Sequence, residues 1–264
     1  MLEKINEIRT KVREKSPLIH AITNPISINQ CANAVLAVGA KPIMAEHPEE
    51  VGEITKRADA LLLNLGNITD TRVKSMLISV EMARQENIPV VVDVVGVSCS
   101  TFRKRFAKEL IEKGNLSIIK GNYSEIKALF EEIYTSRGVD CETEMDEDIV
   151  KKLSQKFGAI VLASGKTDIV SDGKKLITVN NGTAELAKVT GTGCMLGILC
   201  ACYLSVCDDI CAALSACTVL GICGERSKTK KGGGSFFVNL MDNLSTLSDE
   251  DVKKHMKSEV KEFD

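Results

Sequence analysis

The sequence predicts an α/β protein in which helices cover both faces of a mostly parallel central sheet. Short apolar, β-branched runs alternate along the chain with longer amphipathic runs, as in strands that are each followed by a helix. The chain has 264 residues, 44% of them hydrophobic, so it can bury a large core. Because α/β folds of this size commonly remain undivided, we expect residues 1–264 to form a single domain.

The chain up to residue 163 predicts one amphipathic helix and several buried strands. Residues 1–16 mix charged and apolar positions in the pattern of a surface helix. Later runs are short, apolar and β-branched, and each ends in polar or glycine-rich sequence. These predicted strands lie at 60–63, 90–94, 118–119 with its neighbours, and 160–163.

The second half predicts a hairpin and two buried helices. Residues 169–179 place an Asp-Gly turn between two β-rich runs, which indicates a hairpin. Residues 195–206 and 210–223 are almost wholly apolar, and helices that are apolar on all sides are buried. The pair Asp208 and Asp209 between them can cap the second helix.

Charge and hydropathy favour a small-molecule partner in the cytoplasm. The formal net charge is -2 and both signs are interspersed, so no basic stripe suits nucleic acid and no polybasic segment suits a membrane surface. The N-terminal segment has no apolar core of a signal peptide, and no apolar run has the length of a membrane span. We therefore expect a soluble cytoplasmic protein that contacts neither nucleic acid nor membrane.

The ten cysteines indicate free thiols in a reducing compartment. Seven of them fall between Cys194 and Cys223 in helix-like apolar sequence, and the chain has no Cys-x-x-Cys pair. We expect them to be buried and to behave as small hydrophobic residues.

A glycine-rich turn at residues 190–194 is the strongest candidate for an anion site. Gly191, Thr192, Gly193 and Cys194 run directly into the apolar helix. Glycines let backbone N–H groups point inward, and the start of a helix offers unpaired donors and a favourable dipole to a phosphoryl group. A glycine-rich helix start also occurs for purely structural reasons, and the turn alone does not decide between the two.

Polar residues at other strand ends suit Mg²⁺ and phosphates. Ligands of open α/β sheets bind outside the carboxyl ends of the strands, so the four predicted junctions should line one crevice. Asn122 and Glu125 lie three residues apart where a strand meets a helix, and Asp93 ends another strand. The carboxylates are hard oxygen ligands of the kind Mg²⁺ takes. A simple helix cap by Asn122, with Glu125 as a first-turn acid, is the alternative.

Together these pieces resemble the hydroxyethylthiazole kinase family, from about residue 20 to residue 244. The N-terminal part of the resemblance rests on HAITN at 20–24, ANA at 32–34 and GAKPIMA at 39–45. The remaining motifs are NLG at 64–66, DVVG at 93–96, KGNYSE at 120–125, DIVSDG at 168–173 and TGTGC at 190–194.

The resemblance implies a fold, an activity and an assembly. The fold is ribokinase-like without a lid. The activity is ATP-dependent phosphorylation of the hydroxyl of 4-methyl-5-(2-hydroxyethyl)thiazole in thiamine biosynthesis or salvage. The assembly is a homotrimer whose active sites lie between subunits.

The resemblance also implies roles for single residues. Met44 and Gly191 contact the thiazole alcohol, and Asn24 belongs to the same region. Lys120 and Ser164 contact ATP, and we place Asn122 beside them. Asp93 and Glu125 serve Mg²⁺ and the phosphates, while the turn of Gly191, Thr192, Gly193 and Cys194 forms the anion hole.

Four positions depart from the usual patterns. The family usually has Arg at Lys120, Thr at Ser164 and a proline after Asp93; a lysine supplies a point charge rather than a planar fork. Cys194 stands where ribokinase-like enzymes carry an aspartate base, although the family includes forms with cysteine. Since positioning and charge neutralisation dominate phosphoryl transfer, Cys194 is expected to assist the reaction as a base.

Two other readings stay open. A neighbouring ribokinase-like enzyme, either a hydroxymethylpyrimidine kinase or a nicotinamide-nucleotide-hydrate dehydratase, would share the glycine turn, but the motifs at 20–24 and 39–45 argue against it. A non-catalytic nucleotide-binding thiol sensor would explain the cysteines. It would not need Asp93, Glu125 and the glycine turn together.

Overall fold

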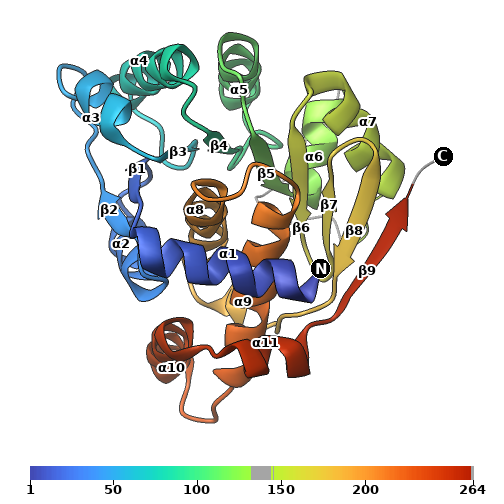
Figure 1. Cartoon of the computed structure of the whole chain (residues 1–264). Coiled ribbons are helices and arrows are strands. Elements are labelled where there is room, and N and C mark those ends of the chain that lie inside the picture. Colours follow the sequence, from blue (N-terminus) through green and yellow to red (C-terminus); the bar gives the residue numbers. More distant parts are fainter. Residues whose placement is uncertain (132–143, 145, 263–264) are drawn as a thin grey trace.

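The computed structural model describes residues 1–131, 144 and 146–262, and within them the chain forms a nine-stranded sheet (Figure 1). The order across the sheet is β2-β1-β3-β4-β5-β6-β7-β8-β9. The strands from β2 to β6 in that order run parallel, and β7, β8 and β9 add to the edge antiparallel. The bounds are β1 (Leu18–Ile22), β2 (Lys41–Ile43), β3 (Ala60–Asn64), β4 (Val90–Asp93), β5 (Ile118–Asn122), β6 (Ile160–Ser164), β7 (Asp168–Ser171), β8 (Lys175–Val179) and β9 (Ser258–Glu262).

Helices cover both faces of the sheet and build two separate hydrophobic cores. One face is covered by α1 (Leu2–Lys15), α2 (Ile28–Ala37), α8 (Thr192–Leu204), α9 (Cys211–Arg226), α10 (Gly233–Thr246) and α11 (Asp249–His255). The other is covered by α3 (Val51–Arg57), α4 (Asp70–Glu86), α5 (Thr101–Lys113), α6 (Tyr123–Phe130) and α7 (Glu147–Phe157). A short 3₁₀ helix, η1 (Leu186–Lys188), precedes α8.

The central strands are apolar because both of their faces are buried. In β3, Leu62 packs into the core under α8 and Leu63 into the opposite core, and in β4 Val91 and Val92 divide in the same way. All four side chains are fully buried. Since successive side chains of a strand point to opposite faces, a strand covered on both sides reads as a continuous apolar run. Each such residue contributes about 1.5–3 kcal/mol of burial.

The expected elements are confirmed. The helix at the N-terminus, the four buried strands, the hairpin of β7 and β8, and the buried helices α8 and α9 all form, with shifts of a few residues at their ends. The N-cap of α9 is Ile210 rather than an aspartate, although Asp209, one residue earlier, accepts the backbone N–H of Cys211 at 2.7 Å.

The sequence did not predict β1, β2 or β9. His20 interrupts the apolar pattern of β1, yet its imidazole is fully buried: Nδ1 is 2.9 Å from Thr55 Oγ1 and Nε2 is 3.0 Å from the Ala45 carbonyl. Both ring nitrogens therefore have hydrogen-bond partners within the protein, so His20 has a structural role and is not a metal ligand.

The expectation that the cysteines are buried free thiols is only partly confirmed. The described cysteines are free, but Cys194 and Cys211 are half-buried and Cys99 is exposed. Cys141 lies outside the described residues. Burial raises the pKa of the Cys223 thiol to about 12, so that side chain acts as a small hydrophobic residue. None of the helices among the described residues combines the length and the apolar character of a membrane span.

Candidate active site

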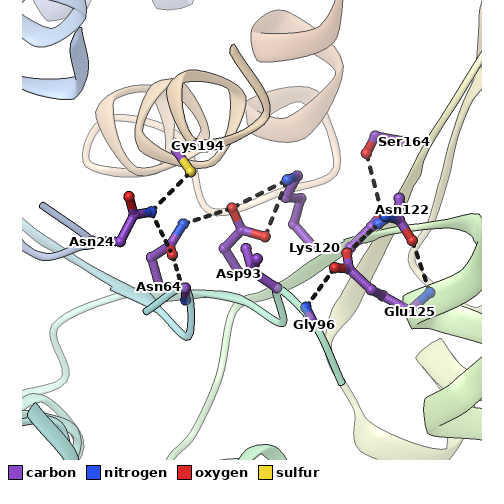
Figure 2. Close-up of polar contacts among 12 residues, drawn as sticks. Asn24, Asn64, Asp93, Gly96, Lys120, Asn122, Glu125, Ser164 and Cys194 are labelled. Atoms are coloured by element: carbon purple, nitrogen blue, oxygen red, sulfur yellow. Dashed lines mark hydrogen bonds and ion pairs between the residues drawn. The ribbon is translucent and has the colours of Figure 1, made fainter. Parts of the chain in front are cut away.

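A chain of side-chain hydrogen bonds runs along the carboxyl ends of the parallel strands (Figure 2). Asn24, which follows β1, donates from Nδ2 to the Sγ of Cys194 at 3.3 Å and to the Oδ1 of Asn64 at 3.2 Å. Asn64 donates from Nδ2 to Asp93 Oδ2 at 3.0 Å. Lys120 Nζ lies 3.1 Å from both Asp93 oxygens. We call these five residues the strand-end chain.

Strand register explains why these distant residues meet. In the parallel pairing, Asn64 lies opposite Asp93, and Asp93 lies opposite Lys120. Side chains at paired positions project from the same face of a sheet. Helix α8 covers that face and packs closely against it at Gly197. A Cβ added at Gly197 would lie 3.2 Å from Asp93 Oδ2. The start of α8 therefore meets the strand ends at these residues, and a ligand crevice at this edge stays a prediction.

The glycine turn opens α8 with uncapped backbone donors. Gly191 is the N-cap with φ of 88°, a left-handed conformation that favours glycine, and no side-chain hydrogen bond caps the helix within the described residues. The first helical bond runs from the Met195 N–H to the Gly191 carbonyl at 2.8 Å, so the preceding amides of Thr192, Gly193 and Cys194 are available. Lys120 Nζ lies 3.6 Å from where a Cβ of Gly193 would stand, which adds a positive charge to the dipole of the helix.

The side chain of Thr192 is used by the fold. Its hydroxyl lies 2.8 Å from the Leu186 carbonyl and 3.2 Å from that of Val189, and the residue is buried. The hydroxyl thus fastens the segment containing η1 to the first turn of α8. Any part of Thr192 in anion binding is left to its backbone N–H.

Asp93 and Lys120 form a buried ion pair. Burial raises the pKa of the Asp93 carboxyl, and the ammonium of Lys120 and the amide of Asn64 oppose that rise. Burial alone would lower the pKa of Lys120, but the attraction of Asp93 and Glu125 outweighs it and raises the value. The carboxylate of Asp93 accepts hydrogen bonds from the Lys120 ammonium and the Asn64 amide, and these donors favour the ionised form of the pair.

Glu125 is held in a capping box at the start of α6, as the alternative reading of this motif expected. Its backbone N–H donates to Asn122 Oδ1 at 2.9 Å, and its Oε2 accepts the Asn122 N–H at 2.8 Å. Its Oε1 accepts the Gly96 N–H at 2.6 Å. Burial raises the pKa of Glu125 to about 7 against the lowering effect of Lys120, and Asp93 adds to the rise. Capping does not use all the lone pairs of the carboxylate, so a metal role stays a prediction.

Ser164 and Met44 lie at the two ends of the edge. Ser164 pairs with Asn122 between β5 and β6, and its Oγ donates to the Gly121 carbonyl at 3.3 Å. Met44 follows β2, is half-buried, and packs against the core beneath α8. The structure thus brings Asn24 into contact with Cys194 and Asp93 into contact with Lys120, and Asn64 joins the two pairs. Glu125, Asn122 and Ser164 lie next along the same edge, and Met44 lies outside the strand-end chain.

Sequence reasoning assigned no role to Asn64. In the sequence it is one residue of the motif NLG at 64–66. Its position in register with Asp93 could be anticipated from two adjacent parallel strands, but its contact with Asn24, 40 residues earlier, could not.

Asp93 and Glu125 suit Mg²⁺ if water and phosphate oxygens supply most of its ligands. Among the described residues there is no group of three or more His, Cys, Asp or Glu side chains that could hold a metal. Mg²⁺ is commonly bound through one or two carboxylates together with waters and substrate phosphates, and the carboxylates of Asp93 and Glu125 are donors of that kind.

Comparisons with known proteins agree with the arrangement of these residues. The model of the hydroxyethylthiazole kinase family matches residues 9–250. The protein named hydroxyethylthiazole kinase 2 from Clostridium botulinum strain Langeland is 46% identical over 260 residues, covering 95% of this chain and 98% of the relative. The chain belongs to the hydroxyethylthiazole kinase family. The family member from Finegoldia magna is 40% identical, with 97% of this chain and 96% of the relative covered.

Solved structures support the same family and its fold. The hydroxyethylthiazole kinase protein of Pyrococcus horikoshii OT3 superposes with a TM-score of 0.90 at 34% identity, covering 98% of this chain and all of the other. The pyridoxal kinase of Bacillus subtilis, in its ADP complex, is 14% identical with a TM-score of 0.62, covering 83% and 95% of the two chains, and shows a shared fold alone. The ribokinase-like fold is confirmed, and no separate lid stands beside the sheet in the described ranges. As a member of a kinase family, the protein uses ATP as co-substrate.

Proposed function

We propose that the protein transfers the γ-phosphoryl group of ATP to the hydroxyl of 4-methyl-5-(2-hydroxyethyl)thiazole, in thiamine biosynthesis or salvage. The observation that carries the proposal is the position of Cys194. Its sulfur lies in the first turn of α8, beside uncapped amides, and is joined through Asn24 and Asn64 to the Asp93–Lys120 pair. A proton acceptor, an anion site and a cation thus lie together.

In this proposal the alcohol binds between Met44, Asn24 and the Gly191 turn. The hydroxyl of the alcohol faces Cys194, whose thiolate form takes up the hydroxyl proton. The bond from the alcohol oxygen to the γ-phosphorus forms as the bond from that phosphorus to ADP breaks, and ADP leaves. The phosphoryl group in transfer is held by the amides at the start of α8 and by the Lys120 ammonium. Because phosphoryl transfer passes through a loose transition state, positioning and charge neutralisation supply most of the acceleration.

The nucleotide lies further along the same edge in this proposal. Lys120, Asn122 and Ser164 face it from β5 and β6, while Asp93 and Glu125 would hold Mg²⁺. When bound, the cation would neutralise charge on the phosphate oxygens. The chain's own contribution is to keep both carboxylates buried and oriented, Asp93 by Asn64 and Lys120, and Glu125 by two backbone amides.

A homotrimer with shared active sites is part of the proposal. Ile26 is 60% exposed directly after the Asn24 region, Leu36 on α2 is 58% exposed, and Val238 on α10 is 58% exposed. Helices α2 and α10 pack against one another, so these apolar side chains belong to neighbouring elements beside the site. A second copy seated there would bury them and enclose the alcohol.

An ADP-release assay with an acceptor panel tests the substrate. Purified protein receives Mg-ATP with the thiazole alcohol, hydroxymethylpyrimidine, a hydrated nicotinamide nucleotide or simple sugars. We expect the thiazole alcohol to give the highest kcat/KM. A higher value with hydroxymethylpyrimidine or the hydrated nucleotide would replace the proposed substrate, and no turnover with any acceptor would favour the nucleotide-binding regulator.

A further inference from the structure

Asn64 is a fully buried amide whose orientation is fixed by three hydrogen bonds. Its Oδ1 accepts the Gly66 N–H at 2.8 Å and the Asn24 Nδ2 at 3.2 Å, while its Nδ2 donates to Asp93 at 3.0 Å. A backbone N–H can only donate, so Oδ1 must face Gly66, and the NH₂ group must then face the carboxylate. The amide cannot flip without losing all three partners.

The chain following β3 is fitted closely around this amide. A Cβ on Gly66 would stand 2.9 Å from both Asn64 Oδ1 and Asn24 Nδ2. Real Cβ atoms do not approach so closely, so the backbone at residue 66 can come near only because the residue is glycine. The loop, the amide and Asn24 are therefore packed directly against one another.

Asn64 joins the two halves of the proposed site. Asn24 and Cys194 lie on the side of the alcohol, and Asp93 and Lys120 lie on the side of the phosphates. Within the described part of the chain, Asn64 is the residue whose side chain bonds to both sides. The NH₂ group of Asn24 donates to Asn64 Oδ1 and to the Sγ of Cys194. The Oδ1 of Asn24 accepts the Ser27 N–H at 3.1 Å.

We propose that Asn64 is a positioning residue that sets the placement of Cys194, through Asn24, relative to the Asp93–Lys120 pair. This inference rests on the proposed function, since it concerns the approach of an acceptor hydroxyl to a phosphoryl group. Asn64 touches neither. Its effect is therefore on turnover rather than on nucleotide binding, because small misplacements of reacting groups cost far more in rate than in affinity.

Asn64→Leu tests the inference because leucine has nearly the same shape and none of the hydrogen bonds. We expect kcat to fall about 30-fold while the KM for ATP changes less than about threefold. Asn181→Leu is the matched control: Asn181 is 5% exposed, donates to the His255 carbonyl at 2.7 Å and accepts the Lys257 N–H at 2.7 Å, outside the strand-end chain. Its kcat should stay near the parental value at temperatures where it is folded. Asn64→Ser replaces the leucine variant if that one does not fold.

A double-mutant cycle on kcat separates positioning from a general loss of structure. If Asn64 acts through Cys194, then Asn64→Leu should lower kcat by a smaller factor in a Cys194→Ala background than in the parent, and the loss that remains reflects its bond to Asp93. An equal fold-loss in both backgrounds, a loss no larger than in Asn181→Leu, or a KM for ATP that rises as much as kcat falls would each overturn the inference.

The same cycle distinguishes this inference from the proposed substrate. It is run with whichever acceptor of the panel gives the fastest ADP release. A parent that prefers another alcohol would overturn the substrate, while the cycle would still support or overturn the role of Asn64. A parent that releases no ADP with any acceptor would overturn both.

Discussion

Lys120 and Asp93 face one another as a buried ion pair, with Nζ 3.1 Å from both carboxylate oxygens and side-chain exposures of 5% and 0%. Each of these buried charges is tolerated in the fold only while the opposite charge lies beside it. Removing one partner leaves an uncompensated buried charge, which typically costs about 3–5 kcal/mol.

Asp93→Asn and Lys120→Met should therefore each lower the free energy of unfolding by roughly 3–5 kcal/mol, while the double variant should lose less than the sum. Urea denaturation at pH 7 measures all four proteins. Additive losses would show that the pair is not coupled in solution. Both single variants should also lose activity on the order of 100-fold, about 2.7 kcal/mol of barrier.

Glu125 should make stability depend on pH in a defined window. Burial raises its pKa from 4.5 to about 7 in the native state, so between these values the native state holds a proton that the unfolded chain has released. Stability from this group is then fully present below about pH 4.5 and is lost as pH rises to about 7, by on the order of 3 kcal/mol.

Denaturation curves of the parent and Glu125→Gln from pH 4.5 to pH 8 test this prediction. The parent should lose stability relative to the variant up to about pH 7, and the difference should then stay constant. If the two pH profiles run parallel, the carboxyl does not titrate in this window. With Mg-ATP and alcohol saturating, Glu125→Gln should also turn over on the order of 100-fold more slowly than the parent.

Gly191 should resist substitution by alanine for two reasons. Its φ is 88°, and a Cβ would lie 3.1 Å from the Cβ of Ser27. Gly191→Ala should cost stability by roughly 1–2 kcal/mol and should lower kcat by disturbing the anion site. Gly158→Ala is the control, because Gly158 has φ of 62° but nothing within 4 Å of the added methyl group. Equal thermal shifts and equal kcat values for the two variants would contradict the crowding at Gly191.

Light scattering should give a particle of about three times 28.6 kDa for the proposed homotrimer. Leu36→Glu places a charge on the exposed apolar side of α2 and should dissociate the particle and reduce turnover. Phe102→Glu is the matched control, since Phe102 is 41% exposed on α5, which covers the opposite face of the sheet. A parent that is monomeric and fully active would refute the shared site.

The side chain of Cys194 should assist turnover without being essential to it. Cys194→Ala should lower the rate of phosphorylation by about 10²-fold or less, because the backbone amides of the turn remain. Cys194→Asp should keep or exceed the parental rate near neutral pH, and Cys194→Ser should fall below it. Initial rates from pH 6 to 9 compare the four proteins. An alanine variant equal to the parent throughout would make Cys194 a packing residue.

Most of the fold could be predicted from the regular burial of its strands and helices. The long-range polar contacts of the site could not be predicted. The strands β3 to β6 were visible because both of their faces are apolar, and the meeting of polar residues at one edge followed from their carboxyl ends. The strand β1 was missed because His20 breaks its pattern, although two buried partners satisfy the ring. The link from Asn24 to Asn64 spans 40 residues and depends on the sheet order, which single-strand patterns do not reveal.

Formation of the thiazole phosphate ester is the most direct test of the proposed function. Parent protein, Mg-ATP and 4-methyl-5-(2-hydroxyethyl)thiazole are incubated, and ADP and ester are quantified together by chromatography with mass detection. The proposal predicts one ester for each ADP. In Asn64→Leu, and likewise in Cys194→Ala, the rate of ADP formation and the rate of ester formation should fall by the same factor as each other. ADP without the ester, or an ester formed only from another alcohol of the panel, would contradict it.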